Sequence, residues 1–467
     1  MHIVHLGSVV LQVEREASRH EFVEKLRKQL REIVRQVVGR CIEEALDAEV
    51  TALLRREWYQ RRRMEDRQRT VAVCTRCGSR YARDFRRDGH YQRHLDMQWG
   101  RVRISVPQVE CACGGHVHIS FQTLRHRQGV WDDLEEEIRE CSGWGMSLRQ
   151  TKASIDARLQ SSVGLRTLNA RIQEMSKLVP EWRKRRLEEI PPVVRVDGIW
   201  LTLMSDTEEQ KRDALGRLRR VKEGRKVAVL VAQGVWPQSG KQAVVAWVVG
   251  QAEDEQSWEA LLTQMYERGI CPEQGLRLIV VDGVSAFEAA RKTVYWDVPV
   301  QRCIFHKLHN IRRDLVLPEE LSRRAARAYR RRFMRSARRI WQAPDEQEAR
   351  RRQRQFCDKW QARQPEAVAT LRRDFDATLT FYRIQARAAQ DDEPWPARHL
   401  RTTSHLEREM RAFRHRLASA VLFHSTQGLE AVVHQLIVRR ANERDGALPG
   451  SWQLSLERAV AALHAIS

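Results

Sequence analysis

Apolar and polar positions follow two different periods along this chain, which divide it into helical and strand-forming regions. From His20 to about Arg69, apolar residues such as Leu26 and Leu30 recur at helical spacing without an interrupting proline. This pattern predicts one or two amphipathic helices. Between residues 191 and 306, three apolar runs rich in β-branched residues are joined by short connections, and helix, strand, helix and strand follow. The second region is therefore expected to form a sheet flanked by helices.

Three strands in a meander, followed by alternating helices and strands, is the order expected of a ribonuclease H-like core with a mixed sheet. We therefore expect an α+β multidomain protein in which an all-helical insertion interrupts that core. The expected segments are an N-terminal helical region at 1–70, a zinc ribbon-like segment at 71–122, a helical and helix-turn-helix-like segment at 123–190, the core at 191–306 and 397–420, the basic insertion at 307–396, and a C-terminal helical segment at 421–467.

Four of the nine cysteines lie in two pairs, Cys74 with Cys77 and Cys111 with Cys113. Short β-like runs separate the pairs, as in a zinc ribbon, where four thiolates replace a core too small to hold itself together. The second pair is CxC, so a nearby histidine could replace one thiolate; the candidates are His116, His118, His90 and His94. The alternative is four unligated cysteines. An odd cysteine count favours reduced thiols over a disulfide framework.

A helix, a short turn and a second helix are expected around residues 147–175. Ser147 can cap the first of these helices, and Gly164 lies in the turn that follows it. Apolar residues on one face of the next helix are Leu165, Leu168 and Ile172. Polar residues that could reach a major groove are Arg166, Asn169 and Arg171. The alternative is a small helical bundle that does not read DNA.

The charge of the chain indicates a polyanionic partner. Lys and Arg number 83 against 61 Asp and Glu, which gives a net charge of +22 and a pI near 10.2. Half of this excess lies between Lys307 and Arg363, where eighteen Lys and Arg face seven Asp and Glu. Lys307, Arg312 and Arg313 are candidates for phosphate contacts. Aromatic residues within the insertion are expected to form its core: Trp341, Phe356, Trp360, Phe381 and Tyr382.

Two aspartates occupy similar local settings in the predicted core. Asp197 in VVRVDGIW and Asp282 in LIVVDGVS each come late in an apolar strand and precede a glycine. If the two strands are neighbours, both carboxylates lie at the same height on one side of the sheet. Carboxylate oxygens are the ligands that Mg²⁺ prefers, usually together with substrate phosphate. The alternative is that each Asp-Gly pair only makes a turn.

The segments VVDGVSAFEAARKTV, VPVQRCIFHKLHNI and LRTTSHLEREMRAFRHRL resemble the catalytic domain of bacterial mutator-type transposases and their relatives with a zinc ribbon. The resemblance covers about residues 190–420. It implies a DDE-type polynucleotidyl transferase whose catalytic carboxylates are Asp197, Asp282 and Glu407. It also implies that Cys303 and His306, the Cys-x-x-His of the next strand, support the site. The family usually has Asn where this chain has Ser404.

Glu407 also stands out without the resemblance. Leu406, Met410, Phe413 and Leu417 form a helical core stripe, and the adjacent face carries Glu407, Arg411 and Arg414. One carboxylate and two guanidinium groups on a line suit a metal and phosphate. The alternative is a surface row of ion pairs. Glu409, the nearest competitor for this role, points to another face.

The leading hypothesis is a transposase that cleaves and joins DNA strands with Mg²⁺ or Mn²⁺, with structural Zn²⁺ in the ribbon. Its partners would be transposon ends, target DNA and at least one further copy of the chain. A second hypothesis is a ribonuclease H-like nuclease or resolvase that never joins strands, and a third is an inactive DNA-binding derivative. No apolar run approaches the length of about 20 residues that spans a bilayer. We expect no membrane association and a cytoplasmic location.

Overall fold

The computed structural model describes residues 2–6, 9–13, 19–58, 60–61, 67–159, 162–283, 285–417, 423 and 425–444. The chain forms two compact units. The first runs as far as Arg171, except for residues 143–145, and the second begins at Ile172. The division falls inside the helical segment expected at 123–190. None of the helices in the described ranges is long and apolar enough to cross a membrane.

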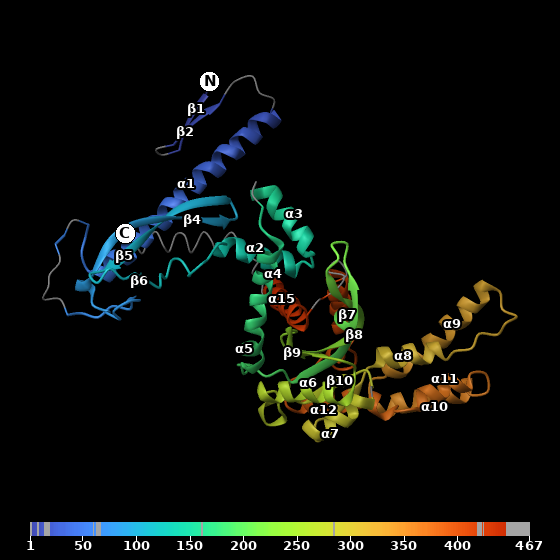
Figure 1. The fold of residues 1–467 in the computed structure, drawn as a ribbon. Helices are drawn as coiled ribbons and strands as arrows, with labels where there is room; N and C mark the ends of the chain where they lie inside the picture. Colours follow the sequence, from blue (N-terminus) through green and yellow to red (C-terminus); the bar gives the residue numbers. More distant parts are fainter. Residues whose placement is uncertain are drawn as a thin grey trace. The chain divides into compact units, whose positions relative to one another are not determined.

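The first unit combines one long helix with three pairs of strands (Figure 1). Its strands pair as β1 with β2, β3 with β6 and β4 with β5, all antiparallel. The bounds are β1 (His2–Leu6), β2 (Val9–Val13), α1 (Arg19–Leu54), β3 (Val73–Cys74), β4 (Phe85–Met97), β5 (Gly100–Cys111) and β6 (Val117–His118). The predicted helical region at 1–70 therefore also contains a strand pair, and its helix ends at Leu54.

Helix α1 packs its C-terminal half against the β4–β5 pair. Ile42 and Leu46 are buried against Leu95 and Ile104 of the two strands. The approach is close, because a Cβ built at Gly39 would lie 2.9 Å from Val102 Cγ1. In contrast, Leu30 and Val37, in the N-terminal half of the predicted apolar stripe, are exposed.

Three helices follow: α2 (Asp132–Gly143), α3 (Leu148–Leu159) and α4 (Leu165–Glu174). Ser147 caps α3 as expected, since its Oγ accepts the Gln150 N–H and the Gln150 side chain accepts the Ser147 N–H. Leu168 and Ile172 of α4 are buried, whereas Leu165 is exposed. The predicted apolar face of α4 is thus correct for two of its three residues.

The second unit is built on a five-stranded mixed sheet with the strand order β11-β10-β7-β8-β9. Strand β8 is antiparallel to β7 and β9, while β10 and β11 run parallel to β7. The bounds are β7 (Val193–Arg212), β8 (Leu218–Val235), β9 (Gln242–Gly250), β10 (Leu278–Val281) and β11 (Val300–Arg302). The meander of β7, β8 and β9, followed by β10 and β11 with helices between the strands, agrees with the expected mixed α/β arrangement.

Each face of this sheet is covered by helices. On one face, Val194, Val196 and Ile279 pack against α6 (Glu255–Glu267) and α7 (Ser285–Val294). On the other face, Val193 and Val280 belong to the core of the helical insertion. Alternate residues of a strand point to opposite faces, so the insertion side is also the side of Arg195 and Asp197.

The insertion begins directly after β11 and is entirely helical. Helices α8 and α9 lie alongside α11 and α10 (Figure 1). The bounds are α8 (Ile304–Arg313), α9 (Arg323–Arg338), α10 (Glu346–Trp360), α11 (Pro365–Arg372), α12 (Thr380–Gln390) and α13 (Ala397–Leu400). The prediction that aromatic residues form its core is confirmed, because all five are at most 8% exposed: Trp341, Phe356, Trp360, Phe381 and Tyr382.

The remaining helices of this unit are α5 (Leu178–Lys184), α14 (Ser404–Leu417) and α15 (Thr426–Arg444). Arg183 of α5 forms an ion pair with Glu430 of α15 at 2.8 Å. The part of the expected C-terminal helical segment that follows residue 444 lies outside the described residues.

Two local expectations were wrong. Strand β7 continues to Arg212, so Asp197 lies inside a long strand and Gly198 does not make a turn. Strand β11 ends at Arg302, and Ile304 already begins helix α8. Cys303 therefore precedes a helix, and His306 lies in the first helical turn instead of on a strand. Cys303 and Ile304 are buried and Phe305 is exposed, which is not the alternation expected of a strand with one buried face.

Candidate active site

Asp197 and Asp282 lie level with each other on neighbouring strands. In the parallel pair, Leu278 is the partner of Val193 and Val280 is the partner of Arg195. Continuing this register by two residues brings Asp282, just beyond the end of β10, opposite Asp197. Both positions alternate with residues that pack against α6 and α7, so both belong to the insertion side of the sheet. The register agrees with the expectation that these carboxylates lie at the same height.

Glu407 reaches the same place from helix α14. Leu406, Met410 and Phe413 are at most 2% exposed and form the buried stripe expected of this helix. The Glu407 N–H donates to the Thr403 carbonyl, and the side chain is 17% exposed. Glu409 is buried on another face, where Gln233 Nε2 donates to its Oε2 at 2.8 Å. Glu409 therefore connects α14 to β8 through this hydrogen bond, and Glu407 is the glutamate of α14 that belongs to the site.

His306 lies between two of the carboxylates. Its Nδ1 is 3.2 Å from Asp282 Oδ1, without hydrogen-bond geometry, and its Nε2 is 3.3 Å from Glu407 Oε1. Burial lowers the pKa of His306 to about 4, and the nearby His309 and Arg302 act in the same direction. The imidazole is therefore neutral at pH 7 and contributes no charge to offset the two acids.

Cys303 contacts the site through a buried threonine. The Thr403 hydroxyl lies 3.3 Å from Cys303 Sγ and 3.3 Å from Glu407 Oε1, and the Thr403 N–H also donates to the sulfur. Burial raises the pKa of Cys303, so the group is a thiol. Ligand atoms of Cys303, His306 and Glu407 lie within 4.8 Å of one another, which makes this trio a rival metal position to the one formed by the carboxylates.

Burial raises the pKa values of the three carboxylates, and neighbouring acids add to this effect at the two aspartates. Burial raises the pKa of Asp197 to about 7, and the charges of Glu407, Asp282 and Glu253 add to the effect. Burial also raises the pKa of Asp282 to about 6, against the opposing influence of Arg302. Glu407 shifts in the same direction, chiefly through burial. These shifts show that the charges of Asp282 and Glu407 act on Asp197, while His306 lies between the Asp282 and Glu407 side chains.

This donor set fits a divalent cation better than it fits an ion-pair network. Within the described ranges, no Lys or Arg forms an ion pair with Asp197, Asp282 or Glu407, and the one basic side chain in contact, His306, is neutral. Oxygen donors of several half-buried carboxylates are the ligands that Mg²⁺ or Mn²⁺ takes.

A fourth carboxylate, Glu253, was missed by the sequence analysis. It precedes α6 and its charge acts on both Asp197 and Asp282. The position of Glu253 also explains why residue 198 is a glycine, since a Cβ there would lie 2.6 Å from Glu253 Oε1. The acidic run from Glu253 to Glu255 was the available signal, but Asp254 caps α6 by accepting the Ser257 N–H, and capping alone would account for such a run.

Arg302 was also missed. Its guanidinium stacks so closely on the turn after Asp282 that a Cβ at Gly283 would lie 2.7 Å from Cζ, and Gly283 has a φ of 87°. Only glycine combines that conformation with that approach. Arg302 forms an ion pair with Asp374 of the insertion, so the insertion holds the one guanidinium next to Asp282.

The candidates for DNA contacts divide into accessible and occupied side chains. The exposed candidates are Arg166, Asn169, Arg312, Arg313, Arg411 and Arg414. Arg171 instead lies 3.3 Å from the buried carboxylate of Glu135. Lys307 is 1% exposed, and its ammonium donates to the Arg373 carbonyl. The predicted phosphate contact of Lys307 is therefore wrong, because Lys307 lies on the same buried face of α8 as Ile304 and Ile311.

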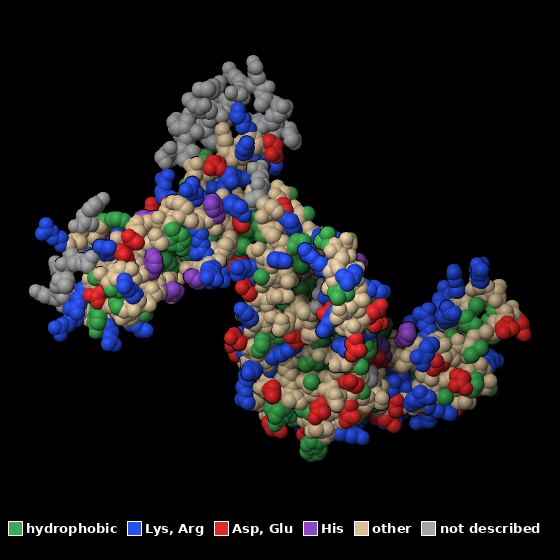
Figure 2. Space-filling view, viewed as in Figure 1, with side chains coloured by type: hydrophobic (Ala, Val, Ile, Leu, Met, Phe, Trp, Pro, Cys, Tyr) green, Lys and Arg blue, Asp and Glu red, His purple; other side chains and the backbone are tan. Residues whose placement is uncertain are grey.

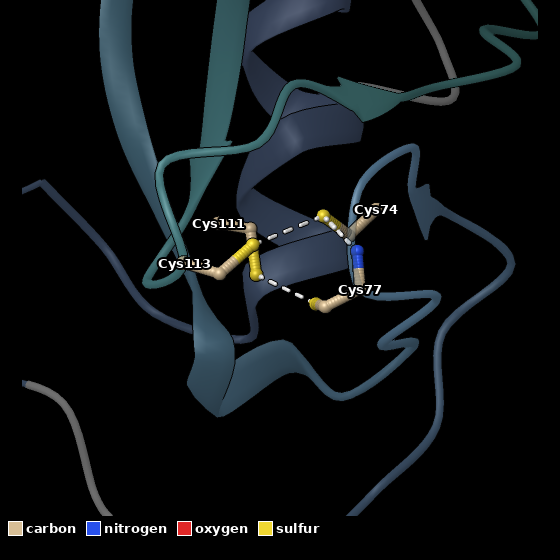
Figure 3. A group of neighbouring side chains, drawn as sticks. All are labelled: Cys74, Cys77, Cys111 and Cys113. Atoms are coloured by element: carbon tan, nitrogen blue, oxygen red, sulfur yellow. Dashed lines mark hydrogen bonds between the residues drawn. The ribbon is translucent and has the colours of Figure 1, made fainter.

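The four cysteines come together in the first unit (Figure 3). Cys74 Sγ is 3.5 Å from Cys113 Sγ, and Cys77 Sγ is 3.6 Å from Cys111 Sγ. These distances exclude disulfides and are close to the ~3.8 Å edge of a tetrahedron with zinc–sulfur bonds of about 2.3 Å. The N–H groups of Cys77 and Arg76 help to lower the pKa of Cys74 to about 6, so a thiolate is favoured there.

Comparison with known sequences places the chain in a family. The sequence model described as "Transposase, Mutator family" matches residues 10–445. The transposase for insertion sequence element ISRM5 of Rhizobium meliloti is 24% identical over 75% of this chain and 78% of its own length. The transposase for IS406 of Burkholderia multivorans is 25% identical, over 78% and 82%. The transposase for IST2 of Acidithiobacillus ferrooxidans is 32% identical over 42% of this chain and 58% of its own length.

The family match extends over both structural units, from within β2 to the end of α15. It includes the cysteine cluster, the three carboxylates and the basic insertion between Asp282 and Glu407. This chain belongs to the Mutator family of transposases.

Proposed function

We propose that this protein is a DDE-type DNA transposase that cleaves DNA strands and joins them to target DNA with Mg²⁺ or Mn²⁺ at Asp197, Asp282 and Glu407. The observation that carries the proposal is the convergence of these acids, from two adjacent strands and one helix, with no ion pair to a Lys or Arg among the described residues. Transposases of insertion sequences among its relatives support the same reaction class.

The topology of the second unit supports a ribonuclease H-like core. A meander of β7, β8 and β9 is followed by β10 and β11, which are reached through helices and run parallel to β7. This is the order expected of that core. Glu407 belongs to it through α14, which returns to the sheet after the helical insertion.

The protein's own residues would hold the reacting groups in place. Bound Mg²⁺ would stabilise negative charge on the phosphate and favour deprotonation of an attacking water or 3′-hydroxyl. His306, as a neutral imidazole between Asp282 and Glu407, holds these two side chains apart at fixed distances. Thr403 orients Glu407 by donating to it, and the exposed Arg411 and Arg414, whose charges act on Glu407, are placed for phosphate.

The cysteine cluster of the first unit is proposed as a structural zinc site in a ribbon-like fold. The cluster is part of a small core in which Cys74 and Cys111 pack with Val50 and Phe85. Four thiolates around one Zn²⁺ would close this core and leave no open coordination position for catalysis. We propose that the exposed Arg166 and Asn169 of α4 contact the DNA of the transposon ends. A synaptic complex that holds two such ends would require at least two copies of the chain.

Asp282→Asn should lower strand cleavage by roughly 10³-fold, because loss of a carboxylate ligand removes several kcal/mol of transition-state stabilisation. DNA binding and zinc content should stay unchanged. The assay uses labelled end fragments, target plasmid and Mg²⁺, with Asp297→Asn, an exposed aspartate before β11, as matched control. Full activity of Asp282→Asn would refute the site. Cleavage without joining by the wild-type protein would support a nuclease instead.

Mg²⁺ should compete with protons for this site. Since the pKa values of Asp197 and Asp282 are raised to about 7 and about 6, both acids become protonated and lose their ligand charge as the pH falls through this range. The half-saturating Mg²⁺ concentration should rise by about tenfold between pH 7 and pH 6, and more steeply below it. Cleavage rates titrated with Mg²⁺ at pH 6, 7 and 8 measure this shift, and an unchanged half-saturation point would contradict it.

Cys74→Ser should release zinc, because three thiolates leave the tetrahedral site open. Elemental analysis of the purified protein should find about one zinc ion per chain in the wild type and clearly less in the variant. Cys41→Ser, which changes a partly buried cysteine of α1 outside the cluster, should keep the wild-type content. A zinc-free wild-type protein, or equal zinc in Cys74→Ser, would refute the zinc site.

A further inference from the structure

A cleft lined by arginines lies on the helical insertion, at the junction of α8 with α9. Its volume is about 510 Å³. The arginines that line it are Arg312, Arg330, Arg331, Arg335, Arg338 and Arg339. Met334 and Gln342 complete the lining, and no acidic residue takes part. Figure 2 shows Lys and Arg side chains gathered along this side of the insertion.

The arginines of the cleft lack carboxylate partners. Helix α9 contains no acidic residue at all. None of the six guanidinium groups forms an ion pair with any residue in the described part of the chain, and five of the six side chains are exposed. Guanidinium groups that repel one another in a concave surface raise the local positive potential and attract anions.

Helix α10 of the same insertion provides a contrast. Its arginines Arg350, Arg351 and Arg352 form ion pairs with Glu346 and Glu348 of their own helix. Hydrogen bonds from Arg351 and Arg352 lower the pKa of Glu348 to about 2. Three arginines of α10 are therefore paired with carboxylates, whereas none of the cleft arginines of α9 forms an ion pair in the described part of the chain. A purely solubilising role predicts no such difference between two neighbouring helices.

The spacing of the free arginines suits a nucleic-acid backbone. Arg331, Arg335 and Arg338 follow one another at intervals of four and three residues, so they lie on one face of α9. They span about 10 Å along the helix axis at ~1.5 Å per residue. Each strand of duplex DNA has one phosphate per about 3.4 Å of its axis, so this row covers about three phosphate spacings and each of the three arginines can reach a separate phosphate. Guanidinium groups bind phosphate oxygens bidentately.

We propose that this cleft binds the phosphate backbone of duplex DNA without reading its sequence, and that α9 is the face of the insertion that grips the DNA. The cleft is separate from the carboxylate site, so it contributes affinity and no chemistry. The choice of DNA as the polyanion rests on the proposed transposase function, whereas the binding of a phosphate backbone rests on the cleft alone.

The test is the salt dependence of DNA binding by the full chain. A variant with Arg331→Gln, Arg335→Gln and Arg338→Gln is compared with one that has Arg350→Gln, Arg351→Gln and Arg352→Gln, which loses the same charge from α10. Binding to a 30-base-pair duplex of arbitrary sequence is measured without added Mg²⁺, so that cleavage does not enter. Melting curves verify that both variants are folded.

The cleft variant should lose on the order of 100-fold in affinity at ~0.1 M salt, and the slope of log K against log salt should become shallower by about 2.7, or 0.9 for each lost phosphate contact. The α10 variant should keep the wild-type slope. Equal losses in both variants, or none in either, would overturn the proposal. Tighter binding of a matched RNA duplex, lost in the cleft variant, would overturn the assignment to DNA. Because no strand is cut in this assay, its outcome is independent of whether the carboxylate site is catalytic.

Discussion

The second unit is organised around the repulsion between carboxylates that the fold forces together. Asp197, Asp282 and Glu407 come from three separate elements; burial raises the pKa of each, and the charges of neighbouring acids raise those of the two aspartates further. In the absence of a cation this arrangement disfavours the charged state of each acid. The sheet, α14 and the insertion must therefore hold the acids in place, and a divalent cation would turn the repulsion into binding.

A buried polar network helps to keep the carboxylates in place. Arg195, 1% exposed, lies two residues before Asp197 and donates to the carbonyls of Arg398 and His399, just ahead of α14. It also reaches Gln233 of β8, which in turn donates to Glu409 of α14. Buried charges of this kind must be compensated, so moving α14 would break several contacts at once. The position of Glu407 is thereby coupled to the sheet that carries the two aspartates.

The helical insertion contributes to the site at close range as well as through its basic surface. Ile304 of α8 donates its N–H to the Arg401 carbonyl, and the buried Cys303 accepts from Thr403, so the start of the insertion is joined to the loop before α14. Asp374 anchors Arg302 beside Asp282. The same insertion presents the unpaired arginines of α9 on its outside. The insertion therefore connects the proposed DNA-binding surface to the elements that hold the carboxylates.

Much of this arrangement was predictable from the sequence, because strong local patterns determine it. Two Asp-Gly pairs after apolar runs located the aspartates, and the core stripe of α14 located Glu407. Local pattern could not show that Cys303 to His306 turns into a helix, since a short apolar run suits a strand equally well. It also missed Glu253 and the burial of Lys307, because both depend on contacts between residues far apart in the chain. The chemical roles of the carboxylates remain proposals.

The most direct test of the central claim is the position of a bound metal ion in crystals grown with Mn²⁺, located by its anomalous scattering. The account predicts a peak within about 2.0–2.3 Å of carboxylate oxygens of Asp197 and Asp282, with Glu407 close by. A peak bound instead by Cys303, His306 and Glu407, with none at Asp197, would contradict it.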